Sequence, residues 1–381
     1  MSQLKELRAS VPWEWRQFEE IDPDSARLVR VDGGDSLVQV CSTQYLGIPW
    51  DVRAQTVLTS LIGTTSASEW GSFGSNYLGG THRARMEFED SVRALARCES
   101  AVAFASGWAA NYAVSEALGR TCQVVISDTR SHNSVIHGLR SAKVDLHVSD
   151  LACCEWHNIL RKHSSDRIGL FCPSVEGISG EAVQPIIPPE HRSRIIWALD
   201  ECHTFGAIGN TGYESFDGMK PDIRVLGLSK ACGTMGSVVC GDKDFMELLP
   251  QLASPWMFST AVPPNIWRIN LELVRFVGQL KAERARILEL ANRLRSNLTR
   301  ASVHGTGKHH ITGILIAPGR ATTFESELRC ARFYAKVSQY PSRPRDNPAV
   351  RVCFTPFHTH EDVDDFSFAI KNSSSVLRGN S

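Results

Sequence analysis

The stretch Gly227-Leu-Ser-Lys230-Ala-Cys-Gly233 decides how the rest of this 381-residue chain is interpreted. It ends the apolar run 223–228, and its glycine return leads into a second apolar run at 237–240. A lysine held at the end of a buried strand loses hydration, which favours the uncharged, nucleophilic form of its amine. Lys230 is therefore a candidate for covalent attachment of a ligand, and this hypothesis requires partner groups elsewhere in the chain.

Composition argues against several classes of protein. The 41 basic and 41 acidic residues balance, so neither nucleic acid nor an anionic membrane is expected as a partner. Residues 1–8 lack an apolar signal core, and no run approaches the roughly 20 apolar residues of a membrane span. The eleven cysteines are odd in number and form no C-x-x-C pair, so we expect reduced thiols in a cytoplasmic protein.

Short apolar runs alternate with helical stretches between residues 100 and 245. Runs of this kind, buried on both faces, predict a mainly parallel sheet in an α/β domain. Ligands of such sheets bind beyond the carboxyl ends of the strands, where the polar clusters of this chain fall. The expected strands are 101–105, 124–127, 144–148, 168–172, 195–199, 223–228 and 237–240.

The whole chain is expected to have four parts. They are an N-terminal arm and first strand (1–50), a large α/β domain (51–265), a bridging helix (266–300) and a small α+β domain (301–381). The arm is expected to contain a short helix and the Trp13/Trp15 pair. Periodicity further predicts helices at 51–61, 83–96, 325–337 and 361–370 and strands at 36–41, 311–316 and 350–355.

Three polar clusters each follow a predicted strand. Ser106-Gly-Trp-Ala-Ala-Asn111 opens a helix and is either a phosphate cradle or an ordinary strand-to-helix turn. His132 either stacks on an aromatic cofactor ring or is a helix-capping or core histidine. Asp200 and His203 either face the nitrogen and oxygen of a pyridine ring or form a surface turn or metal site. The other histidine pairs lack suitable spacing, so we expect no metal.

These clusters supply the partners that Lys230 needs to carry pyridoxal phosphate as a Schiff base. Their order also resembles the α-oxoamine synthases, which are pyridoxal-phosphate enzymes of fold type I. This family includes aminolevulinate synthase, aminooxononanoate synthase, aminoketobutyrate ligase and serine palmitoyltransferase. The resemblance spans residues 36–372 and also includes the stretches Phe258-Ser-Thr-Ala-Val-Pro-Pro264 and Arg351-Val-Cys-Phe-Thr-Pro-Phe-His-Thr359.

The resemblance implies a role for each matching position. Lys230 would hold the cofactor and carry protons, Asp200 would pair with the ring nitrogen, and His203 with the ring oxygen. His132 would stack on the ring. Phosphate ligands would be Ser106, Gly107, Trp108 and Ser229, with Thr260 serving a neighbouring subunit of a homodimer. Arg351 would bind the carboxylate of the amino acid, with Gln44 and Asn76 nearby.

Several positions depart from the family pattern. Gly227 stands where a phosphate-binding threonine is usual, and Thr43-Gln44 replaces an Asn-Asn pair. Ser75-Asn76-Tyr77 replaces a Gly-(Ser/Thr)-Arg stretch, and Gly177 replaces a pocket serine. These changes predict a remodelled wall around the amino acid.

The implied activity is decarboxylative condensation of an amino acid with an acyl thioester, on coenzyme A or a carrier protein, giving an α-amino ketone. Transamination, retro-aldol cleavage or elimination on the same fold remains an alternative, because all of these would use Asp200 and Lys230. A non-catalytic partner subunit is a further alternative, which the intact set of Lys230, Asp200, His203 and His132 disfavours.

Overall fold

The computed structural model describes residues 18–20, 27–340 and 342–377. The helix and the Trp13/Trp15 pair expected in the N-terminal arm lie outside the described residues. The chain divides into two compact units. The first comprises residues 1–43, 177–180 and 286–381, and the second comprises 44–176 and 181–285.

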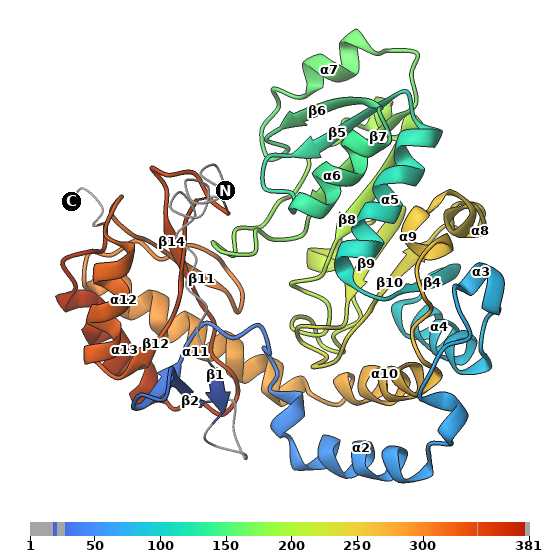
Figure 1. Ribbon diagram of the computed structural model, residues 1–381. Helices are drawn as coiled ribbons and strands as arrows, with labels where there is room; N and C mark the ends of the chain where they lie inside the picture. The colour runs from blue at the N-terminus through green and yellow to red at the C-terminus, as the bar shows by residue number, and fades with distance from the viewer. Residues whose placement is uncertain (1–17, 21–26, 341, 378–381) are drawn as a thin grey trace, which may run out of the picture. The chain divides into compact units, whose positions relative to one another are not determined.

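The second unit is built on a seven-stranded sheet with the order β4-β10-β9-β8-β7-β5-β6 (Figure 1). β10 runs antiparallel to both of its neighbours, and the remaining pairs are parallel. The expected mainly parallel α/β fold is therefore confirmed. Its strands are β4 (Ser100–Phe104), β5 (Val124–Asp128), β6 (Asp145–Ser149), β7 (Ile168–Pro173), β8 (Ile195–Asp200), β9 (Ile223–Gly227) and β10 (Ser237–Gly241).

Burial follows the order of the strands. Every residue of β5, β7 and β9 is buried, whereas the edge strand β6 has exposed positions. Helix α5 (Gly107–Thr121) buries eight residues and packs across one face of the sheet together with α6 (Asn133–Ser141) (Figure 1). The unit also contains α2 (Val52–Thr64), α3 (Asn76–Gly79), α4 (Arg83–Ala96), α7 (His157–Lys162), α8 (Lys243–Leu252) and α9 (Ser254–Met257).

The helical stretch expected from about 263 to 301 is two helices, α10 (Pro264–Val277) and α11 (Lys281–Arg300). Tyr213 explains the break. Its hydroxyl donates to the Val274 carbonyl oxygen at 2.6 Å, which is the acceptor that the Gly278 N–H would use in a continuous helix. The Gly278 N–H bonds to Arg275 instead, at 3.3 Å, and the chain turns.

The first unit holds two small sheets, of order β1-β2-β3-β12 and β11-β14-β13. Helix α12 ends at Cys330, whereas a helix reaching 337 was expected. Arg332 adopts a left-handed conformation with φ 65°, and the Glu325 carboxylate accepts hydrogen bonds from the Val337 N–H and the Lys336 amine. The elements are β1 (Phe18–Glu20), β2 (Leu28–Val31), β3 (Ser36–Gln39), β11 (Thr312–Leu315), α12 (Ala321–Cys330), β12 (Phe333–Tyr334), β13 (Val337–Ser338), β14 (Ala349–Val352) and α13 (His360–Asn372).

No helix among the described residues has both the length and the apolar character needed to cross a bilayer.

His358 is a buried imidazole of the first unit. Its Nδ1 accepts a hydrogen bond from the Thr355 N–H at 3.0 Å, so the proton lies on Nε2, which donates to the Gln39 carbonyl oxygen at 2.8 Å. Burial disfavours the charged ring and lowers the pKa of His358 from 6.5 to about 4.

We expect this residue to destabilise the protein in acid. As the pH falls from about 6.5 to 4, the unfolded chain binds a proton that the folded chain does not, so the free energy of unfolding decreases. Between pH 7 and pH 5 the loss from His358 is about 2 kcal/mol. Urea unfolding at both pH values measures it. His358→Gln should lose less stability over this interval than the exposed control His304→Gln, and equal losses would contradict the assignment.

Candidate active site

Lys230 lies in a tight loop that joins β9 to β10. The Leu228 N–H donates to the Gly236 carbonyl oxygen at 3.1 Å, and the Thr234 N–H donates to the Leu228 carbonyl oxygen at 3.2 Å. Lys230 is half-buried and Ser229 is exposed. The loop therefore fixes its backbone while leaving the lysine amine accessible.

Asp200 ends β8 with a buried carboxylate that is 8% exposed. Its Oδ2 accepts from the Asn111 side-chain amide at 2.7 Å, and its Oδ1 accepts from the Cys202 N–H at 2.9 Å. Within the described part of the chain this carboxylate forms no ion pair. A buried anion held only by neutral donors leaves room for a cationic ligand group, because burial strengthens that attraction.

His132 is the N-cap of α6. Its Nδ1 accepts from the Ser134 N–H at 3.2 Å, so the remaining ring nitrogen, Nε2, carries the proton. The ring packs edge-on against Trp108, with centroids 5.7 Å apart. His132 therefore caps the helix, as one of the two interpretations expected. The exposed part of its ring is still available to a ligand.

The charged groups of Lys230 and Asp200 both affect the pKa of His132. Loss of hydration is the largest effect and lowers the pKa of His132, the Lys230 charge lowers it further, and the Asp200 carboxylate opposes both. A neutral His132 with a proton on Nε2 can therefore donate a hydrogen bond while staying uncharged.

His203 follows Asp200 in the turn after β8. Its Nδ1 lies 2.7 Å from the hydroxyl of the buried Tyr45, which the sequence did not identify as a site residue. This contact fixes the ring, so that its other nitrogen can face a ligand.

The start of α5 carries three candidate phosphate ligands. Ser106 is the N-cap, with its Oγ accepting from the Ala109 N–H at 3.1 Å, and Gly107 and Trp108 are the first helical residues. The first N–H groups of a helix have no acceptor within it and favour anions. The α5 start can therefore hold a phosphate group.

Cys202 explains the missing threonine at 227. A Cβ built on Gly227 would lie 2.9 to 3.0 Å from the Cβ, Sγ and Cα atoms of Cys202, and one on Gly107 would lie 3.1 Å from the same sulfur. The Cys202 side chain thus fills the space that a residue larger than glycine would need at 227.

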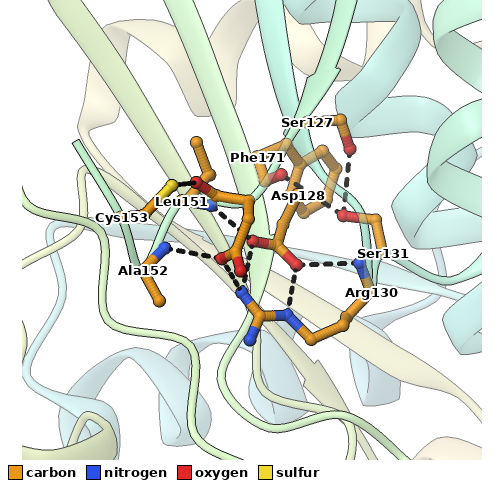
Figure 2. Close-up of polar contacts among 9 residues, drawn as sticks. Ser127, Asp128, Arg130, Ser131, Leu151, Ala152, Cys153 and Phe171 are labelled. Carbon is orange, nitrogen blue, oxygen red and sulfur yellow. Dashed lines mark hydrogen bonds and ion pairs between the residues drawn. The ribbon is translucent and has the colours of Figure 1, made fainter. Parts of the chain in front are cut away.

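A buried ion-pair network supports the loop that leads to His132. Figure 2 shows the Asp128 carboxylate, which is fully buried, accepting from the backbone and side chain of Arg130 and, at 2.9 Å, from the Leu151 N–H. The Arg130 guanidinium also pairs with Asp150. The network joins the end of β5 to the segment after β6 and holds the residues just before His132 in place.

Thr260 and Asn76 belong to a second group of segments. Thr260 forms an isolated bridge with Ser75, and the Asn76 Oδ1 accepts from the Arg85 guanidinium at 2.7 Å. Asn76 and Thr260 line one small pocket with Ala105, the residue before Ser106.

Arg351 lies on β14 of the first unit. Its guanidinium donates to the Gly177 carbonyl oxygen at 3.1 Å and contacts the Cys41 carbonyl oxygen at 3.5 Å. Gln44 belongs to the second unit, where its carbonyl oxygen accepts from the Gly47 N–H at 3.0 Å.

Sequence reasoning missed Asn111, Tyr45 and Cys202 as parts of the site. Asn111 did carry a signal, because it stands one turn after Gly107 and shares its helix face. The contacts of Tyr45 and Cys202 join segments far apart in the chain, and no local pattern announces them.

The candidate site has a lysine, a buried carboxylate, a neutral imidazole and a helix start at one sheet edge, an arrangement that suits a pyridoxal-phosphate enzyme of fold type I. The aminotransferase class I and II family model matches residues 61–370, and the chain belongs to this family. Members of this family use pyridoxal phosphate, so the expected cofactor is confirmed.

Individual relatives are α-oxoamine synthases, which confirms the resemblance. The chain is 28% identical to 8-amino-7-oxononanoate synthase of Maricaulis maris, covering 94% of this chain and 91% of that protein. It is 26% identical to 5-aminolevulinate synthase of Rhizobium meliloti, covering 89% and 86%. Sphingomonas wittichii serine palmitoyltransferase has a similar structure, with a TM-score of 0.84, 18% identity and coverage of 97% and 94%.

The contact between Cys202 and Gly227 predicts that the family threonine cannot simply be restored. Gly227→Thr should destabilise the protein by about 1–3 kcal/mol through overpacking. The double variant Cys202→Ala with Gly227→Thr should recover only the part of that loss that comes from the Cys202 sulfur, because the Cβ and Cα atoms of residue 202 still crowd residue 227. Urea unfolding of all four proteins measures this. Additive effects of the two substitutions would show that the side chains do not compete for space.

Proposed function

We propose that this chain catalyses the decarboxylative condensation of an amino acid with an acyl thioester to give an α-amino ketone. The proposal is supported by the cluster of Lys230, Asp200 and His132 at the carboxyl ends of the strands. It is further supported by relatives that carry the names of two α-oxoamine synthases and match about nine-tenths of this chain. The enzyme would accordingly be an acyltransferase.

The residues present fit pyridoxal phosphate. When bound, this cofactor supplies an electron sink for charge that develops at the α-carbon of the amino acid. We propose that Lys230 attaches it, that Asp200 pairs with its ring nitrogen, and that His203 faces its ring oxygen. The N–H groups at 107 and 108, with Ser106 and Ser229, would bind its phosphate.

Different side chains of the protein would transfer the proton and stabilise the developing charge. The Lys230 amine removes the proton from the α-carbon of the amino acid and later returns one. His132, which carries its proton on Nε2, can stabilise the oxyanion that develops on the acyl carbonyl. The amide of Asn111 and the N–H of Cys202 both donate to the Asp200 carboxylate and hold it in position.

Substrate selection is assigned to the positions that depart from the family pattern. Arg351 is proposed to bind the carboxylate of the amino acid, because a guanidinium pairs with a carboxylate through two hydrogen bonds. Gln44, Asn76 and Gly177 would shape the wall around it. A glycine at 177 leaves more room there than the serine usual in the family.

The assay that tests the reaction measures two products at once. Wild-type protein loaded with pyridoxal phosphate should release free thiol from an acyl thioester and carbon dioxide from an amino acid in equal amounts. Lys230→Ala should lower both by at least about 10³-fold, since it removes the attachment point and the proton carrier together.

Each other outcome identifies a rival. Amino-group transfer or aldehyde release without thiol release would indicate transamination or retro-aldol cleavage. A protein that binds the cofactor but turns over no pairing of the twenty amino acids with short and long acyl thioesters would instead be a partner subunit.

We also propose that the protein is a homodimer with shared active sites. Helix α2 has thirteen residues, of which only Ala54 is buried. Large apolar side chains in the segment that follows α2 in the sequence are strongly exposed, with Phe73 at 84% and Leu78 at 83%. Apolar surface of this extent favours a protein partner. Thr260, itself exposed, is proposed to reach the phosphate bound in the neighbouring subunit.

Charge at this apolar surface should separate the subunits. The double variant Phe73→Asp with Leu78→Asp should behave as a monomer by light scattering coupled to size exclusion and should lose cofactor more readily. Phe368→Asp, which alters an aromatic residue 67% exposed on α13, is the matched control and should remain dimeric. A monomeric wild-type protein would contradict the proposal.

A cytoplasmic location is proposed from the thiols. All eleven cysteines are free, and six of them are buried, which suits a reducing compartment.

A further inference from the structure

The edge strand β6 carries a group of side chains that the proposed reaction does not use. Asp145 and His147 are two residues apart on this strand and therefore share one face of it. His163 follows directly after α7. Asp145 pairs in register with Val124, the first residue of β5, whereas the loop to His132 leaves β5 at its other end. The group thus lies toward the amino ends of the strands, away from the end at which the loop to His132 begins.

The ligand atoms of Asp145, His147 and His163 all lie within 4.8 Å of one another. The His147 Nε2 is 3.4 Å from one Asp145 carboxylate oxygen, and the His163 Nε2 is 3.8 Å from the other. Neither ring nitrogen has a hydrogen-bond partner among the described residues, although both atoms are buried. Leaving buried polar atoms unpaired is costly, so their convergence needs a reason.

Asp166 sets the orientation of the His163 ring. The carboxylate of Asp166 accepts from the His163 Nδ1 at 2.9 Å, which places the proton on Nδ1 and leaves the lone pair of Nε2 directed at Asp145 and His147. A carboxylate behind a histidine, on the side away from the ligand, is the usual outer arrangement of metal-binding histidines.

The spacing also matches a metal ion. Ligand bonds of about 2.0–2.1 Å in a tetrahedron put neighbouring ligand atoms roughly 3.4 Å apart. The His147 Nε2 lies at this distance from one Asp145 oxygen, and the His163 Nε2 lies 0.4 Å beyond it from the other oxygen of the same carboxylate. Two imidazole nitrogens and one carboxylate suit zinc and similar transition metals better than magnesium or calcium.

We propose that Asp145, His147 and His163 form a binding site for a divalent transition metal of the zinc class. Three protein ligands leave a fourth position for water. Asp145 is half-exposed, with a side chain 54% accessible, so the site is open to solvent. The ion would tie the edge strand β6 to the end of α7 and cover part of the sheet edge. We did not expect a metal from the sequence, because the stretch between His147 and His163 conceals their proximity.

Zinc binding by the cofactor-loaded, full-length protein tests the site. Equilibrium dialysis against chelator-buffered Zn²⁺, followed by metal analysis, should find one Zn²⁺ per wild-type chain that the double variant His147→Ala with His163→Ala lacks. Asp166→Asn should weaken binding by about 10–100-fold through loss of the outer carboxylate. The exposed control His304→Ala should bind as the wild type does.

Two controls distinguish loss of this site from misfolding and from zinc bound elsewhere on the protein. Cofactor absorbance and circular dichroism of each variant show whether it has folded, and Asp145→Asn serves if the double variant has not. Zn²⁺ should also raise the melting temperature of the wild type and not that of the ligand variants. Equal zinc content and affinity in the wild type and the ligand variants would overturn the proposal.

Discussion

The buried carboxylate of Asp200 is the constraint on which the rest of the site depends. A carboxylate buried at the end of a central strand needs hydrogen-bond donors, and Asn111 on α5 and the N–H of Cys202 both donate to it. Asn111 also donates to Ser134 on α6, next to the capping residue His132. One carboxylate thereby links β8, α5 and α6. The packing of the two helices on the sheet and the placement of the candidate site residues therefore depend on the same hydrogen bonds.

Much of this fold could be predicted from local pattern. The apolar runs located all seven strands of the large sheet to within a residue or two, and the periodicity of residues 83–96 predicted α4 exactly as observed. The break between α10 and α11 escaped prediction because it depends on the hydroxyl of Tyr213, distant in the chain. The early end of α12 depends in the same way on Glu325 bonding to residues 336 and 337. Local propensity cannot report a competing tertiary hydrogen bond.

The candidate site likewise combines residues that local pattern predicts with contacts that it does not predict. Lys230, Asp200, His132 and the α5 start were recognisable because each follows a strand in one linear order. In the sequence, Gly227 was visible only as a glycine in place of the usual threonine. The structure shows the reason, because a side chain at 227 would collide with Cys202. A departure from a family pattern at one position is therefore best understood through its neighbour in space.

The single buried residue of α2 has a consequence for how the protein folds. A helix of thirteen residues is near the lower limit of independent stability in water, and this one buries only Ala54 against its own chain. If a second subunit supplies the missing contacts, ordering of α2 becomes linked to association and follows mass action. Dilution would then disorder the segment before Gly71. The concentration of the protein would thus determine what fraction of the chains is assembled with α2 ordered.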